Sequence, residues 1–334
     1  MSELVFHKIQ LGTESEEGTA VAATAVYPCD PGAVTEIDRS PQDPVEDYGH
    51  ISEQHAGRGA YGVRLAKLTL PSLVRFEDII RLFDMGVAGG VTPTAAGGGY
   101  WNWKYTADDS ADSLKSRTVE EGTTDQQAWQ IKGALIDTFT LEFGPITAPG
   151  EFPWKISAEL IGRDKQPISF TAGLSAPSNL ETMQGHYSTV AIGSNAVAFG
   201  SLPALTASLI QYRLTVNNNI KMRIYGGTTD TATSHGRLHR QIGVEAQVKM
   251  SATTKNVVYD IFNAAQTAAI EQRMRVSCAG TGSNAMTIDH RLRYSAIPLA
   301  ERDGEQVYSI SGKAVRDDTL SSDLEIAVTN LIAS

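Results

Sequence analysis

Stretches in which apolar and polar residues alternate dominate the chain. The clearest cover 135–144 and 151–162, and two more cover 210–216 and 219–224. A period of two is typical of a half-buried antiparallel strand. We therefore expect four strands here, the last two joined by a hairpin turn at Asn217–Asn219. The residues expected to point inward are Leu135, Phe139, Leu141, Phe143, Trp154, Ile156, Ala158, Leu160, Ile210, Tyr212, Leu214, Val216, Ile220, Met222 and Ile224.

Two stretches have helical spacing instead. Within Val74–Met85, apolar residues recur at the i, i+3, i+4 and i+7 positions of one helix face, and Lys255–Gln272 has a similar pattern with an alanine-rich end. The residues on these two faces are Phe76, Ile79, Ile80 and Phe83, then Val257, Ile261, Ala264 and Ala265. Several strands and one helix in each half predict an α+β fold, mainly β, in which the helix packs on a sheet.

The two halves also resemble each other along the chain. HAGRGAYGV at His55–Val63 matches HGRLHRQIGV at His235–Val244, and the other landmarks keep the same order at offsets near 180. These further matches are Leu11–Thr19 with Ile192–Ser201, Gly62–Met85 with Gly243–Ala265, Trp101–Ala107 with His290–Ala296, Gln130–Ala134 with Ser309–Ala314, and Lys155–Ile161 with Glu325–Ile332. The pattern predicts a tandem duplication.

The duplication divides the chain into two domains. We expect the first over residues 1–165, a loop-rich linker over 166–185 with proline and serine, and the second over 186–334. The polar, acidic stretch 29–60 is expected to form a long exposed loop or open hairpin, and the glycine-rich stretch 85–101 a second, flexible loop.

Charge is distributed unevenly between the halves. Residues 1–180 contain 25 Asp and Glu against 14 Lys and Arg, whereas residues 181–334 contain 13 against 14. An acidic half disfavours a nucleic-acid-binding protein, because binding requires clustered basic side chains. Solvated surface explains the acidic residues equally well.

Redox and targeting signals are sparse. Cys29 and Cys278 lie far apart and form no disulfide framework or CxxC motif. The N-terminal stretch has no basic region followed by an apolar core, and no apolar run reaches the roughly 18 residues of a membrane span. We expect a soluble protein.

His235 and His239 stand four residues apart, the spacing of the two histidines in an HExxH zinc site. Such a site also needs a helix and a glutamate, whereas here Gly236 follows the first histidine and the segment leads into a strand. A loop-to-strand junction, the second copy of 55–63, is the favoured interpretation.

Other catalytic patterns are missing from the sequence. It has no GxSxG motif, and the glycine-rich segment GGVTPTAAGGG lacks the GK[ST] of a phosphate loop. Solvated surface is the favoured interpretation of three acidic pairs, Asp108/Asp109, Glu120/Glu121 and Asp317/Asp318. We therefore expect no enzyme, with no catalytic, cofactor-binding or metal-binding residues and no cofactor.

The densest aromatic patch is YWNWKY at Tyr100–Tyr105. Such a patch can stack on bases or sugars. The favoured alternative is a strand whose Trp101, Trp103 and Tyr105 share one face and pack against a core or a partner subunit.

Several of these segments together resemble the tail tube (major tail) proteins of long-tailed, non-contractile bacteriophages. The resemblance rests on KIQLGTESEEGTAVAATAVYPCD at Lys8–Asp30, on the strand–helix unit Gly62–Asp84, and on LIDTFTLEFG followed by PWKISAELIG. It covers nearly the whole chain, through patterns of strands and glycines and not through an invariant signature. It implies β-sandwich domains with a flanking helix, whose sheet edges join neighbours into rings that stack into a DNA-conducting tube.

The resemblance also implies partners and a location. Six such units usually make a ring, so two tandem units imply a trimeric, pseudo-sixfold ring. The implied partners are other copies of the chain, the tail tip and tail terminator proteins, the tape measure protein in the lumen, and genomic DNA that passes without specific binding. The resemblance further implies that no membrane is involved, that the protein is made in the host bacterial cytoplasm, and that it resides in the virion. Carboxylates lining the lumen would repel DNA, and Glu142 and Glu159 are candidates. The alternative function is a two-domain β-sandwich that binds carbohydrate or a host surface.

Overall fold

The computed structural model describes residues 7–30, 34–38, 41–42, 60–61, 64–107, 113–123, 127–146, 152–225, 231–259, 271–302 and 304–333. Antiparallel strands dominate these residues, and the helices among them are short. This confirms the predicted class, α+β and mainly β.

Among the described residues, the first half contains twelve strands and one helix. In chain order these are β1 (His7–Thr13), β2 (Ala25–Tyr27), β3 (Val34–Asp38), β4 (Pro41–Gln42), β5 (Ala60–Tyr61), β6 (Leu65–Leu73), α1 (Ile79–Gly86), β7 (Thr94–Gly97), β8 (Tyr100–Thr106), β9 (Arg117–Thr123), β10 (Ala128–Phe143), β11 (Lys155–Gly162) and β12 (Asp164–Ile168).

The part of the second half that the structure describes continues with eleven strands and short helical turns. These are η1 (Gly185–Tyr187), β13 (Ser188–Gly193), η2 (Phe199–Ser201), β14 (Ala204–Leu205), β15 (Leu209–Asn217), β16 (Ile220–Arg223), β17 (Ser234–Arg237), β18 (Gln241–Lys249), α2 (Ala252–Thr254), the π-helical turn η3 (Lys255–Tyr259), β19 (Glu271–Ala279), β20 (Ala285–Ala296), β21 (Leu299–Arg302), β22 (Glu305–Val315) and β23 (Glu325–Asn330).

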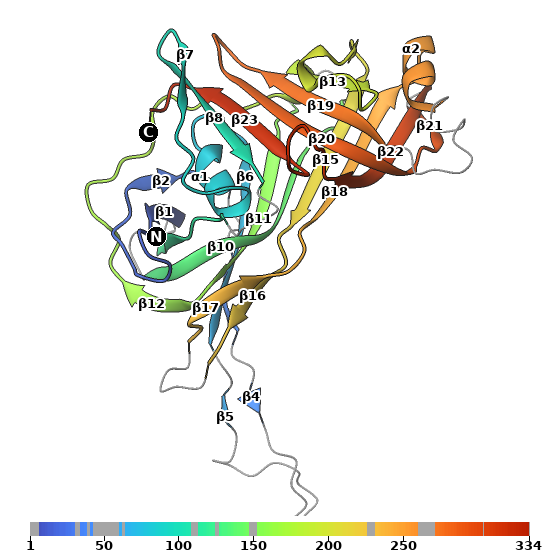
Figure 1. Ribbon diagram of the computed structural model, residues 1–334. Helices are drawn as coiled ribbons and strands as arrows, with labels where there is room; N and C mark the ends of the chain where they lie inside the picture. Colours follow the sequence, from blue (N-terminus) through green and yellow to red (C-terminus); the bar gives the residue numbers. More distant parts are fainter. Residues whose placement is uncertain are drawn as a thin grey trace, which may run out of the picture.

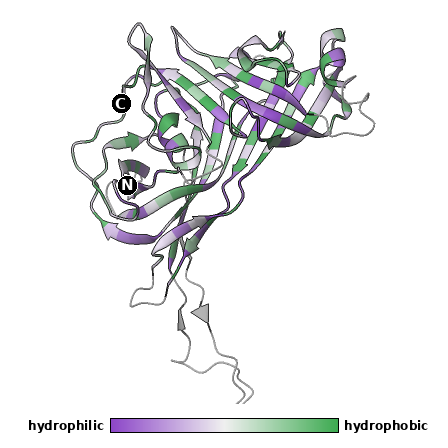
Figure 2. Cartoon of the chain, viewed as in Figure 1, coloured by the Kyte–Doolittle hydropathy of each residue, from purple (hydrophilic) through white to green (hydrophobic). Residues whose placement is uncertain are grey.

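One long sheet crosses both halves (Figure 1). Its antiparallel strands lie in the order β3, β6, β11, β10, β15, β18, β22, and then β20 followed by β21 along the same edge of β22. Hydrophobic and hydrophilic residues alternate along these strands (Figure 2). Their inward residues form one core that includes both halves of the chain.

The long strands β10 and β20 each take part in further pairings. Residues 128–134 of β10 pair with β9, which pairs with β1, while residues 128–132 also pair with β12. Gly133, within the register shift at the end of the β9 pairing, has a φ of 62°, a conformation that glycine adopts without steric cost. Similarly, residues 285–293 of β20 pair with β19, which pairs with β13, and residues 285–289 pair with β23.

The two halves therefore use the same pairing scheme. Eight antiparallel pairings of the first half each have a counterpart in the second half, between strands in the same chain order. The counterparts are β1–β2 and β13–β14, β3–β6 and β15–β18, β4–β5 and β16–β17, β1–β9 and β13–β19, β9–β10 and β19–β20, β10–β11 and β20–β22, β6–β11 and β18–β22, and β10–β12 and β20–β23. The hairpin β7–β8 has no counterpart among the described strands.

This scheme agrees with only some of the matches between the halves in the sequence. It places β1 with β13 and β6 with β18, as those matches do. However, the matches of β8 with β20, β10 with β22 and β11 with β23 join strands that have different partners. Even the β6–β18 match is out of register, since it sets exposed Lys67 against fully buried Val248. Because side chains alternate between faces, a slip by an odd number of residues reverses inside and outside.

The first predicted helix is confirmed as α1. Ile79, Ile80 and Phe83 lie on its buried face, while Phe76 is buried just before the helix begins. In the second half, the π-helical turn η3 covers the start of the predicted helix and contains Val257. The predicted end is wrong, because Glu271 and Gln272 lie in strand β19. The residues Ile261, Ala264 and Ala265 lie outside the described residues.

The predicted hairpin at Asn217–Asn219 is wrong. β15 pairs with β10 and β18, whereas β16 pairs with β17 and projects from the sheet with it (Figure 1). Asn219, between β15 and β16, has a φ of 50°. In this projecting hairpin Ile220 is buried but Ile224 is 46% exposed, so the inward position predicted for Ile224 is also wrong.

Two predicted loops contain strands. Within 29–60, β3 pairs with β6, and β4 pairs antiparallel with β5, as in the open hairpin expected as the alternative. Residues 43–59 lie outside the described residues. Within 85–101, β7 and the start of β8 form a hairpin, so the prediction of a flexible loop is wrong there. The last strand of the first half, β12, continues to Ile168, three residues beyond the expected end of the first domain at 165.

Candidate assembly surfaces

The two halves meet where β10 pairs with β15. The register runs from Thr138 opposite Asn217 to Phe143 opposite Tyr212. On the core side, Trp154 packs between Phe143 and Tyr212, with ring centroids 4.6 Å and 5.8 Å away. The contact is head-to-tail, because β15 is the counterpart of β3 and not of β10.

Asn218 stabilises the joint between the halves, that is, the pairing of β10 with β15. It is fully buried, and its amide nitrogen donates to the carbonyl oxygens of Gly86 and Ile136, each at 2.9 Å. Its amide oxygen accepts a hydrogen bond from Arg237 at 3.0 Å. One side chain therefore joins α1, β10 and the β16–β17 hairpin.

Replacing Asn218 by alanine is expected to lower the free energy of unfolding by about 1–3 kcal/mol, because two buried carbonyl groups lose their donor. Urea denaturation of Asn218→Ala measures this. Asn256→Ala, at an exposed asparagine, is the control and should leave the midpoint unchanged. Equal midpoints for all three proteins would show that Asn218 does not stabilise the joint.

A second contact between the halves uses the aromatic strand β8, which pairs with β23. Trp103 is 8% exposed and its indole nitrogen donates to Ile332 O at 3.2 Å. Tyr105 is fully buried and its hydroxyl donates to Ile80 O at 3.1 Å. Trp101 is half-buried against the same core. The interpretation of this patch as a core-packing strand is confirmed.

The outward face of the long sheet is polar and carries both signs of charge. Glu142 lies opposite Arg213, 2.6 Å away, and Arg213 also lies 3.8 Å from Glu245. Lys155 and Glu159 are exposed on the same face of β11. Both predicted lumen candidates, Glu142 and Glu159, are thus on this face, but the charge of Glu142 is compensated by Arg213.

The two histidines of HGRLHRQIGV do not converge. His235 lies in β17 with its Nδ1 2.8 Å from Glu17, whereas His239 is exposed in the link to β18. Burial opposes the negative charge of Glu17, but His235 and Arg163 outweigh that effect and hold the pKa of Glu17 below its usual range. His235 therefore fastens the β16–β17 hairpin to the segment after β1.

Two of the three acidic pairs expected at the surface are wholly or partly buried. Glu120 is 2% exposed in β9 and accepts hydrogen bonds from the backbone and hydroxyl of Thr171, at 2.8 Å and 2.6 Å. Asp317 is fully buried, and Arg273 holds both of its oxygens at 2.8 Å and 2.9 Å. Glu121, next to Glu120, is also buried at 8% exposure. The prediction of solvated surface is therefore wrong for Glu120, Glu121 and Asp317. Asp108 and Asp109 lie outside the described residues.

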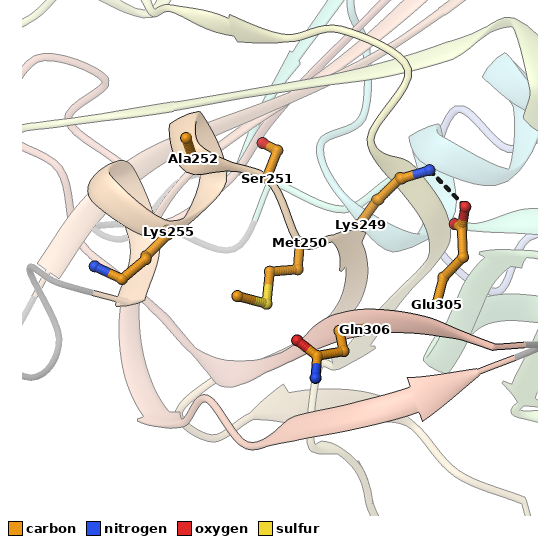
Figure 3. A pocket seen from close by; sticks show the side chains of 7 residues that line it. All are labelled: Lys249, Met250, Ser251, Ala252, Lys255, Glu305 and Gln306. Carbon is orange, nitrogen blue, oxygen red and sulfur yellow. Dashed lines mark hydrogen bonds and ion pairs between the residues drawn. The ribbon is translucent and has the colours of Figure 1, made fainter.

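A hollow of about 430 Å³ opens between the end of β18 and the start of β22 (Figure 3). Its polar lining includes Lys249, which lies 2.6 Å from Glu305. Met250 contributes an apolar side chain to the lining, and Ser251 caps α2 by accepting from the Thr254 backbone. Glu305 compensates the charge of Lys249. The side chains that line the hollow do not combine a nucleophile with a base.

The remaining chemistry is limited. Burial raises the pKa of the Cys278 thiol to about 11, which disfavours the reactive thiolate. Within the described ranges, no group of three or more His, Cys, Asp or Glu side chains is placed to hold a metal ion. Nor does any helix of the described chain have the length and hydropathy to cross a membrane.

No protein-family model and no curated protein matches the chain.

Proposed function

We propose that this protein is a structural subunit of a bacteriophage tail tube. Three copies close a ring of six similar units, and stacked rings enclose a lumen that conducts DNA during ejection. The observation that carries the proposal is the head-to-tail pairing of β10 with β15 between two halves that share one pairing scheme. A unit that binds its own likeness head-to-tail can bind further copies in the same way, which produces a ring or a filament.

The pairing scheme supports a tandem duplication as the origin of the two units. Eight pairings recur between strands in the same order, a coincidence that independent folds would not produce. A closed ring would also pair the two outer edges of the long sheet, at β3 and at β21, along which no further described strand pairs. Unpaired edges otherwise favour aggregation.

The polar face of the long sheet supports a passage for DNA. Its charges are interspersed, as with Glu142, Arg213 and Glu245, and basic clusters of the kind that grip phosphate are not formed by these residues. A wall of this kind lets DNA slide past without specific binding. We accordingly propose the tape measure protein as the occupant of the lumen before ejection, the tail tip and terminator proteins as partners at the tube ends, and the virion as its location.

The carbohydrate-binding alternative draws on the aromatic strand β8. Because the polar atoms of Trp103 and Tyr105 are engaged inside the fold, these rings offer no platform for a sugar, and no other observation favours this function.

Negative-stain electron microscopy of the concentrated, purified protein tests the proposal. We expect hollow tubes or rings with threefold symmetry, and native mass spectrometry should give three chains per ring. A protein that stays monomeric at every concentration while it binds immobilised glycans would refute the proposal and support the alternative.

A further inference from the structure

The end of the long sheet that lies farthest from β3 is formed by β20 and β21. It resembles the β10–β15 joint between the halves, but without a strand in the position of β15. There β20 and β21 run along β22 as β10 runs along β11. The free side of β10 is covered by β15, but no described strand pairs with the corresponding side of Ala296–Arg302. At the other end, β3 pairs with β6 as β15 pairs with β18.

A shared irregularity fixes the equivalence of residues. The register shifts by one between Ile136 and Thr138 in β10–β11, and again between Tyr294 and Ala296 in β20–β22. Ser295 therefore corresponds to Asp137. Counting on from this bulge, Leu299 corresponds to Leu141 and Ala300 to Glu142.

The exposure of Leu299 indicates what is missing. Leu141 is fully buried, with β15 supplying Leu214 opposite it. Leu299, at the equivalent position, is 51% exposed. The difference is explained by the strand that covers Leu141 and has no described counterpart over Leu299.

The backbone of this edge is oriented to accept a strand. The backbone of Ser309 in β22 donates to Pro298 O at 3.0 Å, so Pro298 directs its carbonyl toward β22. Successive residues of an antiparallel strand direct their backbone groups to opposite sides. The N–H and C=O groups of Ile297 and Leu299 therefore face the free side, and the missing N–H of Pro298 is not needed there.

We propose that this edge binds β3 of a second copy of the chain, in the register that β10 and β15 use. The pairing of β3 with β6 corresponds to the pairing of β15 with β18. In this correspondence Val34 is equivalent to Arg213, and Asp38 is equivalent to Asn217. Ala300 of one copy then lies opposite Val34 of the next, and Ala296 opposite Asp38. This rests on the proposed function, because it specifies the contact through which its copies join.

Engineered disulfides test the register. In a Cys29→Ser background, the pair Ala300→Cys and Val34→Cys should cross-link between chains, because directly opposite Cβ atoms in antiparallel strands lie within about 5.5 Å. Non-reducing electrophoresis should show covalent dimers and trimers. The pair Glu142→Cys and Arg213→Cys is the template control and should cross-link within one chain. The pair Ala300→Cys and Thr35→Cys, slipped by one residue, should not cross-link.

A charge at the exposed leucine tests the surface without a cross-link. Leu299→Lys should fold as the wild type does, since the side chain is exposed in the monomer, but assembly should fall at least roughly tenfold because the charge would be buried in the contact. Leu331→Lys is the matched control, since Leu331 is 52% exposed outside this edge, and it should assemble normally.

The outcomes separate this inference from the proposed function. If the wild type forms rings or tubes while the Ala300–Val34 pair fails to cross-link and Leu299→Lys assembles normally, the inferred contact is wrong and the tube proposal stands. If the pair cross-links in open chains and the wild type never forms rings or tubes, the contact stands and the tube proposal fails. Equal cross-linking of the slipped pair would overturn the register.

Discussion

Replacing Trp154 by alanine is expected to lower the free energy of unfolding by about 3–5 kcal/mol, the range for removing a fully buried large aromatic side chain. Trp154 is fully buried, and it packs against Phe143 of the first half and Tyr212 of the second. Its indole nitrogen also donates to Ser188 Oγ at 3.0 Å. The cavity would therefore open in the joint itself.

Urea denaturation and limited proteolysis measure this effect. Trp129→Ala is the matched control, because Trp129 is only partly buried and lies in the segment of β10 that pairs with β9 and β12, away from the joint, with the Lys165 ammonium 4.7 Å from its ring centroid. We expect the control to lose about 1 kcal/mol or less. If both variants lost the same small amount, Trp154 would not hold the halves together.

The sequence predicts the elements of this joint but not their pairing. The alternation in 135–144 and 210–216 predicts both strands and most of their inward residues, since the period of two follows from side-chain geometry. That β10 and β15 are neighbours depends on contacts across 75 residues, such as Thr140 with Thr215. No local pattern contains this information.

The wrong predictions have specific physical causes. Asn217–Asn219 has the composition of a hairpin turn, yet Asn218 is held in the core by partners at Gly86 and Ile136. Glu120 and Asp317 have the residue type of a solvated surface, yet Thr171 and Arg273 satisfy their oxygens inside the protein. In each case a distant partner overrides the local preference.

The edge proposed to bind a second copy, Ala296–Arg302, could not be predicted from sequence patterns either. PLAER at Pro298–Arg302 has no distinctive motif. The edge can be recognised only when the strand pairings of the two halves are compared, because Leu299 is then equivalent to the buried Leu141. What indicates this edge is that Leu299 is exposed whereas the equivalent Leu141 is buried. The two positions can be matched only once the fold is known.

The second large effect that we expect is a loss of stability in acid through His290. This side chain is fully buried, and neither ring nitrogen has a hydrogen-bond partner among the described residues. Burial lowers the pKa of His290 from 6.5 to about 4. Between these values the unfolded chain binds a proton that the folded protein does not, so stability is full above pH 6.5 and falls as the pH decreases toward 4. The total loss amounts to about 3 kcal/mol.

His290→Leu should remove this contribution, and the comparison with wild type isolates it from other buried groups. Asp78 acts in the opposite direction: burial raises its pKa from 3.8 to about 7, so its contribution is present at low pH and is lost as the pH rises toward 7. Urea midpoints at several pH values between 4.5 and 7.5 provide the measurement. His239→Leu, at an exposed histidine, should keep the full wild-type slope. If His290→Leu kept that slope as well, protonation of His290 would not be what limits stability in acid.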